Sequence, residues 1–229
     1  MKIAGIHKNS FVDFPGKLAI IAFTPGCNMN CFYCHNRTLI SGSSEEFIDT
    51  DDFFQLLTKR KGFIDGVVIS GGEPTLQKDL EGFMEKVKSL GYAVKLDTNG
   101  TNPYAIENLI DKGLVDYIAM DVKAPFTKYN EVCCTNVDIE SIKKSIEVLK
   151  NSAVDYEFRT TVAPGLEMDD IFEIAKGIAG ARLYVLQKYR DVNGKATKDS
   201  HSPQFLLDAA VKIKGIVRQV ETRGAAFCA

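Results

Sequence analysis

Short apolar segments that alternate with amphipathic helical segments constrain the fold of this chain more than any other feature. The apolar segments, which we expect to be strands, are residues 18–23, 66–70, 93–96, 117–120, 155–162 and 182–186. Helical patterns occupy residues 50–61, 78–90, 103–112, 139–149 and 169–179. Such alternation requires parallel strands joined by right-handed crossovers, with helices outside the sheet. The sequence therefore predicts an α/β fold, and periodicity alone leaves both a barrel and a flat doubly wound sheet open.

Polar or glycine-rich stretches directly follow four of these strands. They are Thr24-Pro25-Gly26, Gly71-Gly72-Glu73-Pro74, Asp97-Thr98-Asn99-Gly100 and Asp121-Val122-Lys123. The carboxyl ends of parallel strands meet at one edge, and in barrels the active site is built there. Each stretch also has a purely structural explanation as a turn, a helix cap or an ion pair at a strand end. We expect the functional site on this edge.

Three cysteines, Cys27, Cys31 and Cys34, lie within eight residues in the loop after the first predicted strand. A structural zinc site has four protein ligands, usually from two separate Cys pairs, and this triplet has no second pair to complete it. A cluster of four irons and four sulfides is held by Cys thiolates, so three thiolates leave one iron open to an exogenous molecule. The triplet favours such a cluster, with zinc as the alternative.

The rest of the composition argues against several other classes of protein. The net charge is −2 and the basic residues are scattered, which argues against a nucleic-acid or membrane surface. No apolar run approaches the roughly 18 residues of a membrane span, and charged residues interrupt the N-terminus before a signal sequence could form. Cys133, Cys134 and Cys228 form no second Cys-x2-Cys pair, and we interpret them as buried or incidental thiols. The spacing of the six cysteines fits a reducing cytoplasm better than a secreted disulfide framework.

The Cys-x3-Cys-x2-Cys spacing, with Tyr33 just before the last Cys, resembles the signature of the radical S-adenosylmethionine (SAM) enzymes. The stretch from Ser10 to Gly16 and the sequence Cys34-His35-Asn36 resemble the glycyl-radical-enzyme activating enzymes, most closely those of anaerobic ribonucleoside-triphosphate reductase. The resemblance covers about residues 5–188. It implies a partial (β/α)6 barrel, an open parallel sheet with helices outside. We expect one domain over residues 1–229, with a core at about 16–190 and an extension at 191–229 that contains a turn at 193–195, a helix from Ser202 and an edge strand at 217–222.

The resemblance also implies how the site is divided among residues. Cys27, Cys31 and Cys34 would hold a [4Fe-4S] cluster, and the Gly-Gly-Glu segment would bind the amino group of SAM. Tyr33 and Asn36 would lie around its adenine and ribose, and Lys123 would contact its carboxylate. Oxygens of Asp97, Thr98 and Asp121 would hold a monovalent cation beside SAM. The full set expected to bind the cofactor is Tyr33, Asn36, Ser70, Gly71, Gly72, Glu73, Asp97, Thr98, Asp121 and Lys123.

The implied activity is reductive cleavage of SAM, followed by removal of a hydrogen from a glycine of a partner glycyl-radical enzyme. The partner would be anaerobic ribonucleotide reductase, and flavodoxin or ferredoxin would supply the electron. No side chain would act as an acid or base, and Asp13, His35 and Arg159 would grip the substrate loop. One alternative is a radical SAM enzyme acting on a small molecule, similar to 7-carboxy-7-deazaguanine synthase. Another is a binding module stabilised by zinc or a cluster, without turnover.

Overall fold

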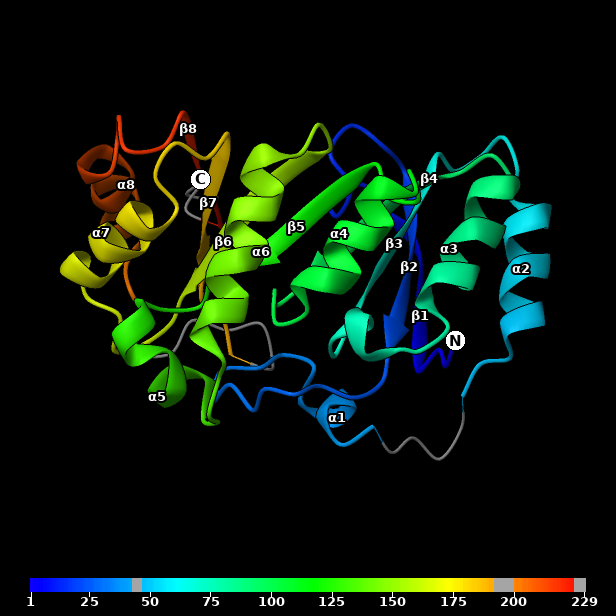
Figure 1. Cartoon of the computed structure of the whole chain (residues 1–229), viewed down its shortest axis with the longest axis horizontal. Helices are drawn as coiled ribbons and strands as arrows, with labels where there is room; N and C mark the ends of the chain where they lie inside the picture. Colours follow the sequence, from blue (N-terminus) through cyan, green and yellow to red (C-terminus); the bar gives the residue numbers. More distant parts are fainter. Residues whose placement is uncertain (43–46, 192–199, 225–229) are drawn as a thin grey trace.

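The computed structural model describes residues 1–42, 47–191 and 200–224 and contains one eight-stranded sheet in the order of the chain (Figure 1). The strands are β1 Gly5–Ser10, β2 Ala19–Thr24, β3 Gly66–Gly71, β4 Ala93–Thr98, β5 Tyr117–Asp121, β6 Asp155–Val162, β7 Leu183–Lys188 and β8 Gln219–Arg223. β1 pairs antiparallel with β2, and every other neighbouring pair is parallel. Because β1 and β8 are the two edges, the sheet is open, as the sequence predicts.

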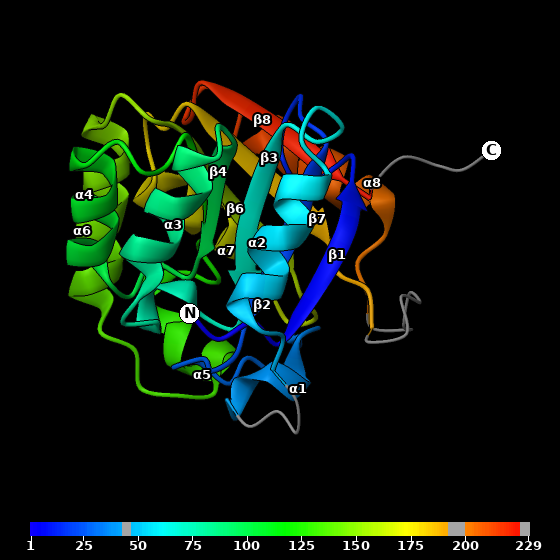
Figure 2. The same cartoon turned by 90° about the vertical axis from the view of Figure 1, so that its right-hand side faces the viewer.

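The helices cover the outer face of the sheet (Figures 1 and 2). The longer ones are α2 Thr50–Lys59, α3 Leu80–Ser89, α4 Pro103–Asp111, α6 Ile139–Asn151, α7 Met168–Gly177 and α8 Pro203–Lys212. Side chains that satisfy free backbone N–H groups fix where they begin. Asp138 caps α6, and Asn102 and Ser202 cap α4 and α8, each just before a proline that suits a first helical turn. The short helices α1 Arg37–Ile40 and α5 Tyr129–Cys133, which we did not predict, lie at the lower end in Figure 1, where β2 ends.

Alternating residues of each strand face the helices or the interior of the curved sheet. The large core under the helices is apolar and includes Val67, Ile69, Val94 and Leu96. The inner face has only a small apolar cluster: Phe14, Ala19, Ile21, Val68, Tyr117 and Ala119. Nearer the carboxyl ends of the strands the inner face is polar, and the candidate site lies on this polar part.

Two strands, β1 and β8, extend the six that alternate with helices in the sequence. β8 confirms the edge strand expected at 217–222, and it continues the parallel sheet beside β7. β1 was missed because its sequence, Gly-Ile-His-Lys-Asn-Ser, is polar and half exposed. The expected turn at 193–195 lies outside the described residues, as does Cys228. Among the helices of the described residues, none is long and apolar enough to cross a membrane.

Candidate active site

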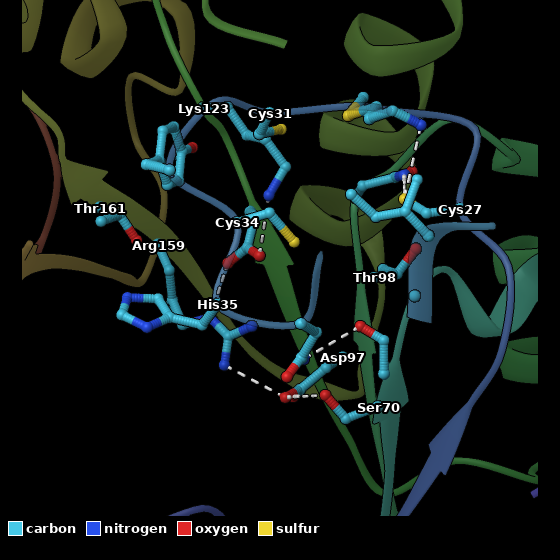
Figure 3. Close-up of a pocket in the computed structure, with 18 residues that line it drawn as sticks. Cys27, Cys31, Cys34, His35, Ser70, Asp97, Thr98, Lys123, Arg159 and Thr161 are labelled. Atoms are coloured by element: carbon cyan, nitrogen blue, oxygen red, sulfur yellow. Dashed lines mark hydrogen bonds and ion pairs between the residues drawn. The ribbon is translucent and has the colours of Figure 1, made fainter. Parts of the chain in front are cut away.

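A cavity of about 200 Å³ opens at the carboxyl edge of the parallel strands (Figure 3). It gathers most of the residues that the sequence singled out. Those that line it are Cys27, Cys31, Tyr33, Cys34, His35, Asn36, Ser70, Gly71, Gly72, Asp97, Thr98, Asp121, Lys123 and Arg159. They come from the loop after β2 and from the ends of β3 to β6, so the edge predicted from the sequence is where the polar residues converge.

The three cysteines are free thiols on a loop whose shape is fixed by backbone contacts. The N–H of Cys34 donates to the carbonyl oxygen of Cys31 at 3.1 Å, and the Arg37 guanidinium donates to the same carbonyl at 3.2 Å. Burial raises the pKa of the Cys27 and Cys34 thiols. A hydrogen bond from the Cys133 thiol lowers the pKa of Cys31. Cys133 is buried, in agreement with the interpretation as a buried or incidental thiol, but it lies beside a predicted ligand.

The Gly71-Gly72-Glu73 turn is pressed against the start of the cysteine loop. The N–H of Glu73 donates to the carbonyl oxygen of Gly26 at 2.8 Å, and a Cβ at Gly72 would lie 2.0 Å from that oxygen. Only glycine fits such an approach of two backbones. On the other side of the turn, the side-chain amide of Asn36 donates to the carbonyl oxygen of Gly71 at 3.2 Å.

The Glu73 side chain does not line the cavity. It is fully buried, and its carboxylate accepts hydrogen bonds from the hydroxyl groups of Thr75 and Thr98 at 2.6 and 2.7 Å and from the N–H of Asn99 at 2.6 Å. Burial raises the pKa of Glu73 despite these donors. The carboxylate therefore holds the end of β4 in place, while the two glycines face the cavity.

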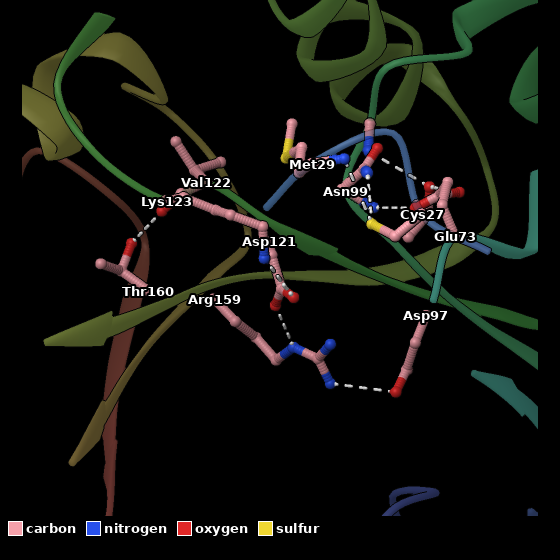
Figure 4. Close-up of polar contacts among 12 residues, drawn as sticks. Cys27, Met29, Glu73, Asp97, Asn99, Asp121, Val122, Lys123, Arg159 and Thr160 are labelled. Carbon is pink, nitrogen blue, oxygen red and sulfur yellow. Dashed lines mark hydrogen bonds and ion pairs between the residues drawn. The ribbon is translucent and has the colours of Figure 1, made fainter. Parts of the chain in front are cut away.

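A row of charges crosses the inner face beneath the cavity (Figure 4). Arg159 bridges two carboxylates, with Nε 2.8 Å from Asp121 and Nη1 3.4 Å from Asp97. Lys123 lies 3.2 Å from Asp121, and the fully buried Lys95 lies 2.5 Å from Asp97. Three cations thus face two carboxylates, and the excess positive charge suits a ligand that carries a carboxylate.

These charges also set the protonation of the row. Burial by itself would raise the pKa of Asp121, but Arg159 and Lys123 outweigh it and lower that pKa to about 2. Burial of Asp97 is likewise outweighed by Arg159 and Lys95, which lower its pKa. Both carboxylates are therefore ionised at neutral pH.

The predicted substrate contacts are divided between two places. His35 is exposed at the rim of the cavity, with its ring 6.3 Å from that of Tyr189, and Arg159 lies within the charged row. Asp13 does not line the cavity. Ser10 at the end of β1 pairs with Ala19 at the start of β2, so the antiparallel strand carries Asp13 to the opposite edge, where it accepts a hydrogen bond from the Ser10 hydroxyl.

The sequence analysis missed several residues that line the cavity. They are Met29, Ile40, Asn99 and Thr161. Asn99 had a usable signal, since it directly follows Asp97-Thr98 at a strand end. Thr161 had a weaker one, because it lies two residues after Arg159 and so shares its face of β6.

A family model supplies the deciding comparison, since the model of the Radical SAM superfamily matches residues 21–178. The chain belongs to this superfamily. A protein of Methanocaldococcus jannaschii, provisionally named a glycyl-radical enzyme activating enzyme, is 39% identical over 214 residues, which are 89% of this chain and 83% of that protein. The pyruvate formate-lyase 1-activating enzyme of Escherichia coli is 27% identical over 232 residues, 91% of each chain. These relatives place the chain with the activating enzymes of glycyl-radical enzymes, as the motifs predict.

Solved structures agree on the fold. A radical SAM methyltransferase from Sphaerobacter thermophilus aligns with a TM-score of 0.70 over 95% of this chain and 69% of its own length. Its sequence identity is only 14%, so the likeness concerns the fold and not the reaction. The prediction of a radical SAM type of open α/β sheet is confirmed.

As a radical SAM enzyme, the protein uses a [4Fe-4S] cluster and SAM, and the residues around the cavity fit both. Among the described residues, no three His, Cys, Asp or Glu side chains are grouped closely enough to hold a single metal ion. A zinc ion needs all its sulfur ligands at about 2.3 Å, whereas a cluster spreads its thiolates over separate irons. Three free thiols spread around one cavity therefore suit the cluster, and the charged row suits the zwitterionic end of SAM.

Proposed function

We propose that this protein activates a glycyl-radical enzyme by removing a hydrogen from a glycine of that partner. One observation carries the proposal: three free thiols, two bare glycines and a charged row all face a single cavity. The relationship to activating enzymes supports the choice of a protein substrate over a small molecule. When bound and reduced, the cluster would supply one electron to cleave SAM into methionine and a 5′-deoxyadenosyl radical, which would take a hydrogen from the glycine and leave as 5′-deoxyadenosine.

Within this proposal, Cys27, Cys31 and Cys34 are the ligands of the cluster. The arrangement around them supports it, since Arg37 and backbone hydrogen bonds fix the shape of the loop. We do not propose His35 as a fourth ligand, because SAM requires the open iron. Its ring is exposed at the rim of the cavity.

The chain's other polar groups would bind and orient SAM. The backbone of Gly71 and Gly72 is accessible to the amino group, and Lys123, supported by Asp121, is available to the carboxylate. Tyr33 and Asn36 would lie along the adenine and ribose, and Ser70, which donates to Asp97 at 3.1 Å, would stiffen the wall. A monovalent cation beside SAM would draw on oxygens of Asp97, Thr98 and Asp121. Since Arg159 and Lys95 already bind the two carboxylates, such a cation requires these ion pairs to rearrange.

The substrate loop of the partner would meet His35 at the rim and Arg159 below it. Asp13, at the opposite edge, would contact only a segment that extends through the interior of the open sheet. Anaerobic ribonucleotide reductase is the partner we favour, because residues 10–16 and 34–36 resemble its activators. We propose flavodoxin or ferredoxin as the reductant, the cytoplasm as the location, and a single domain over residues 1–229.

The test is anaerobic and compares the wild type with two cysteine variants. After reconstitution with iron and sulfide and reduction with dithionite, the wild type should form 5′-deoxyadenosine from SAM. Cys31→Ala should abolish product, whereas Cys134→Ala, at an exposed thiol that does not line the cavity, should leave it unchanged. A fully loaded wild type that cleaves no SAM, with or without a partner, would contradict the proposed chemistry.

The partner is tested separately by electron paramagnetic resonance. Addition of anaerobic ribonucleotide reductase to the reduced enzyme and SAM should produce a glycyl radical signal. A signal with another glycyl-radical enzyme but not with the reductase would overturn the choice of partner alone.

A further inference from the structure

Asn99 joins the cysteine loop to the Gly-Gly-Glu turn through both its side chain and its backbone (Figure 4). Its side-chain nitrogen Nδ2 lies 3.9 Å from Cys27 Sγ and 2.8 Å from Asn28 Oδ1. Its backbone N–H donates to Glu73 Oε2 at 2.6 Å. The residue is 5% exposed, so these contacts are made away from bulk water. No role was assigned to Asn99 above, although it lines the cavity.

The orientation of the Asn99 amide follows from its other partner. Oδ1 accepts hydrogen bonds from the backbone N–H of Thr101 at 3.0 Å and from the Thr101 hydroxyl at 2.7 Å. Because a backbone N–H only donates, the atom that faces it must be the oxygen, and the nitrogen must face Cys27. The Thr101 hydroxyl in turn accepts from Asn28 Nδ2 at 2.8 Å, which closes a ring of three side chains.

The ring fixes the orientation of the Asn99 amide. In the assembled enzyme Cys27 is a thiolate, and an N–H group that points at it stabilises the negative charge. Hydrogen bonds to the cluster sulfurs are among the features that set the reduction potential of an iron–sulfur cluster. The N–H of Met29 donates to the same sulfur at 3.4 Å, but it belongs to the loop itself, whereas Asn99 comes from the end of β4.

We propose that Asn99 is a positioning residue that holds Cys27 and raises the reduction potential of the cluster. Reduction adds negative charge to the cluster, so a fixed donor beside one of its ligands favours the reduced form. The backbone N–H of Asn99 also binds Glu73, so Asn99 fixes the position of the cluster loop relative to the turn that carries Gly71 and Gly72. The inference rests on the ligand role of Cys27 that is part of the proposed function.

The experiment measures the midpoint potential of the cluster by a redox titration that is followed by electron paramagnetic resonance. Asn99→Asp keeps the acceptor for Thr101, removes the donor and adds a negative charge, while Asn99→Ala removes the donor without adding charge. Both retain the backbone contact with Glu73. The control is Asn102→Asp, which makes the same amide-to-carboxylate change three residues along, where the side chain caps α4 and contacts the carbonyl of Thr75 rather than a cysteine.

We expect the reduced-to-oxidised ratio at the wild-type midpoint to fall about tenfold in Asn99→Asp, which is about 59 mV for a one-electron couple. Asn99→Ala should shift in the same direction by less, and Asn102→Asp should stay within about twofold of the wild type. If either Asn99 variant folds but retains less iron than Asn102→Asp, the positioning of Cys27 is supported directly.

Equal iron content and equal potentials in all four proteins would overturn the inference. A wild type that takes up no iron and sulfide would overturn the ligand role of Cys27 and this inference with it. If the potentials of the variants differ from the wild type as expected but the wild type forms no glycyl radical, only the proposed substrate is contradicted, so the two failures are distinguishable.

Discussion

Arg223→Met is expected to destabilise the protein strongly, because Arg223 neutralises a carboxylate in the interior of the sheet. Glu157 on β6 is fully buried, and its two oxygens accept from the Arg223 guanidinium at 2.8 and 2.6 Å. The Tyr117 hydroxyl donates to the same carboxylate at 3.1 Å. Burial and the charge of Glu157 both raise the pKa of Tyr117, so its hydroxyl is protonated and donates at neutral pH.

The magnitude follows from the burial of the pair. Removing one partner of a buried ion pair costs about 3–5 kcal/mol, because an uncompensated charge remains. The side chain of Arg223 is 35% exposed, so water reaches part of the site after the substitution, and we expect the lower end, about 3 kcal/mol. For a chain of this size, each kcal/mol lowers the melting temperature by about 2–4 °C, so the fall should be roughly 6–12 °C.

Thermal and urea unfolding followed by circular dichroism measure this loss in a double-mutant cycle. Glu157→Gln combined with Arg223→Met should recover most of it, because the neutral amide still hydrogen-bonds to Tyr117. Arg218→Met, at an exposed arginine just before β8, is the matched control and should change stability by less than about 0.5 kcal/mol. If Arg223→Met is no worse than Arg218→Met, the ion pair does not hold β8 to the sheet.

Two further substitutions test the site. Gly72→Ala should lower stability by about 1–3 kcal/mol and reduce iron binding, because its Cβ would clash with the Gly26 carbonyl. The control Gly82→Ala, on an open helix surface, should stabilise the protein by about 0.5–1 kcal/mol. Equal iron content in the two variants would contradict this prediction. Asp121 has a pKa lowered to about 2, so the roughly 2 kcal/mol that its ionised form contributes is present above pH 4 and about half is lost by pH 3. In Asp121→Asn, the free energy of unfolding measured with urea should fall less between pH 5 and pH 3 than in the wild type. An unchanged dependence on pH would refute the lowered pKa of Asp121.

The sequence predicted the parallel part of the fold well because buried strands have a strong local signal. β6 was predicted at its observed bounds, residues 155–162, since both of its faces are covered. β1 has no such signal, because an edge strand paired on one side tolerates His7, Lys8 and Asn9. Its antiparallel direction is set by pairing with β2 and not by its own residues. The sequence therefore did not show that Asp13, predicted to grip the substrate loop, lies at the edge opposite the cavity.

The contact between Cys133 and Cys31 shows a second kind of limit. The two residues are far apart in the sequence, and the short helix α5 brings them together, with the N–H of Asn30 donating to the carbonyl of Cys133 at 3.0 Å. Helices this short have little propensity signal, because nucleation is costly and tertiary contacts stabilise them. Spacing rules could find three cysteines on one loop but not a fourth that arrives from another element.

Glu73 shows that a sequence motif can predict where a segment lies without predicting which of its atoms face the cavity. The Gly-Gly-Glu segment was predicted to bind an amino group, and its position at the cavity follows from the strand that precedes it. Whether a side chain or the backbone faces the ligand depends on which groups lie behind the turn. Here Thr75, Thr98 and Asn99 donate to the carboxylate from behind, so burying it costs less than leaving those donors unpaired. The carboxylate is therefore bound within the protein, and Gly71 and Gly72 are the residues of the segment that line the cavity.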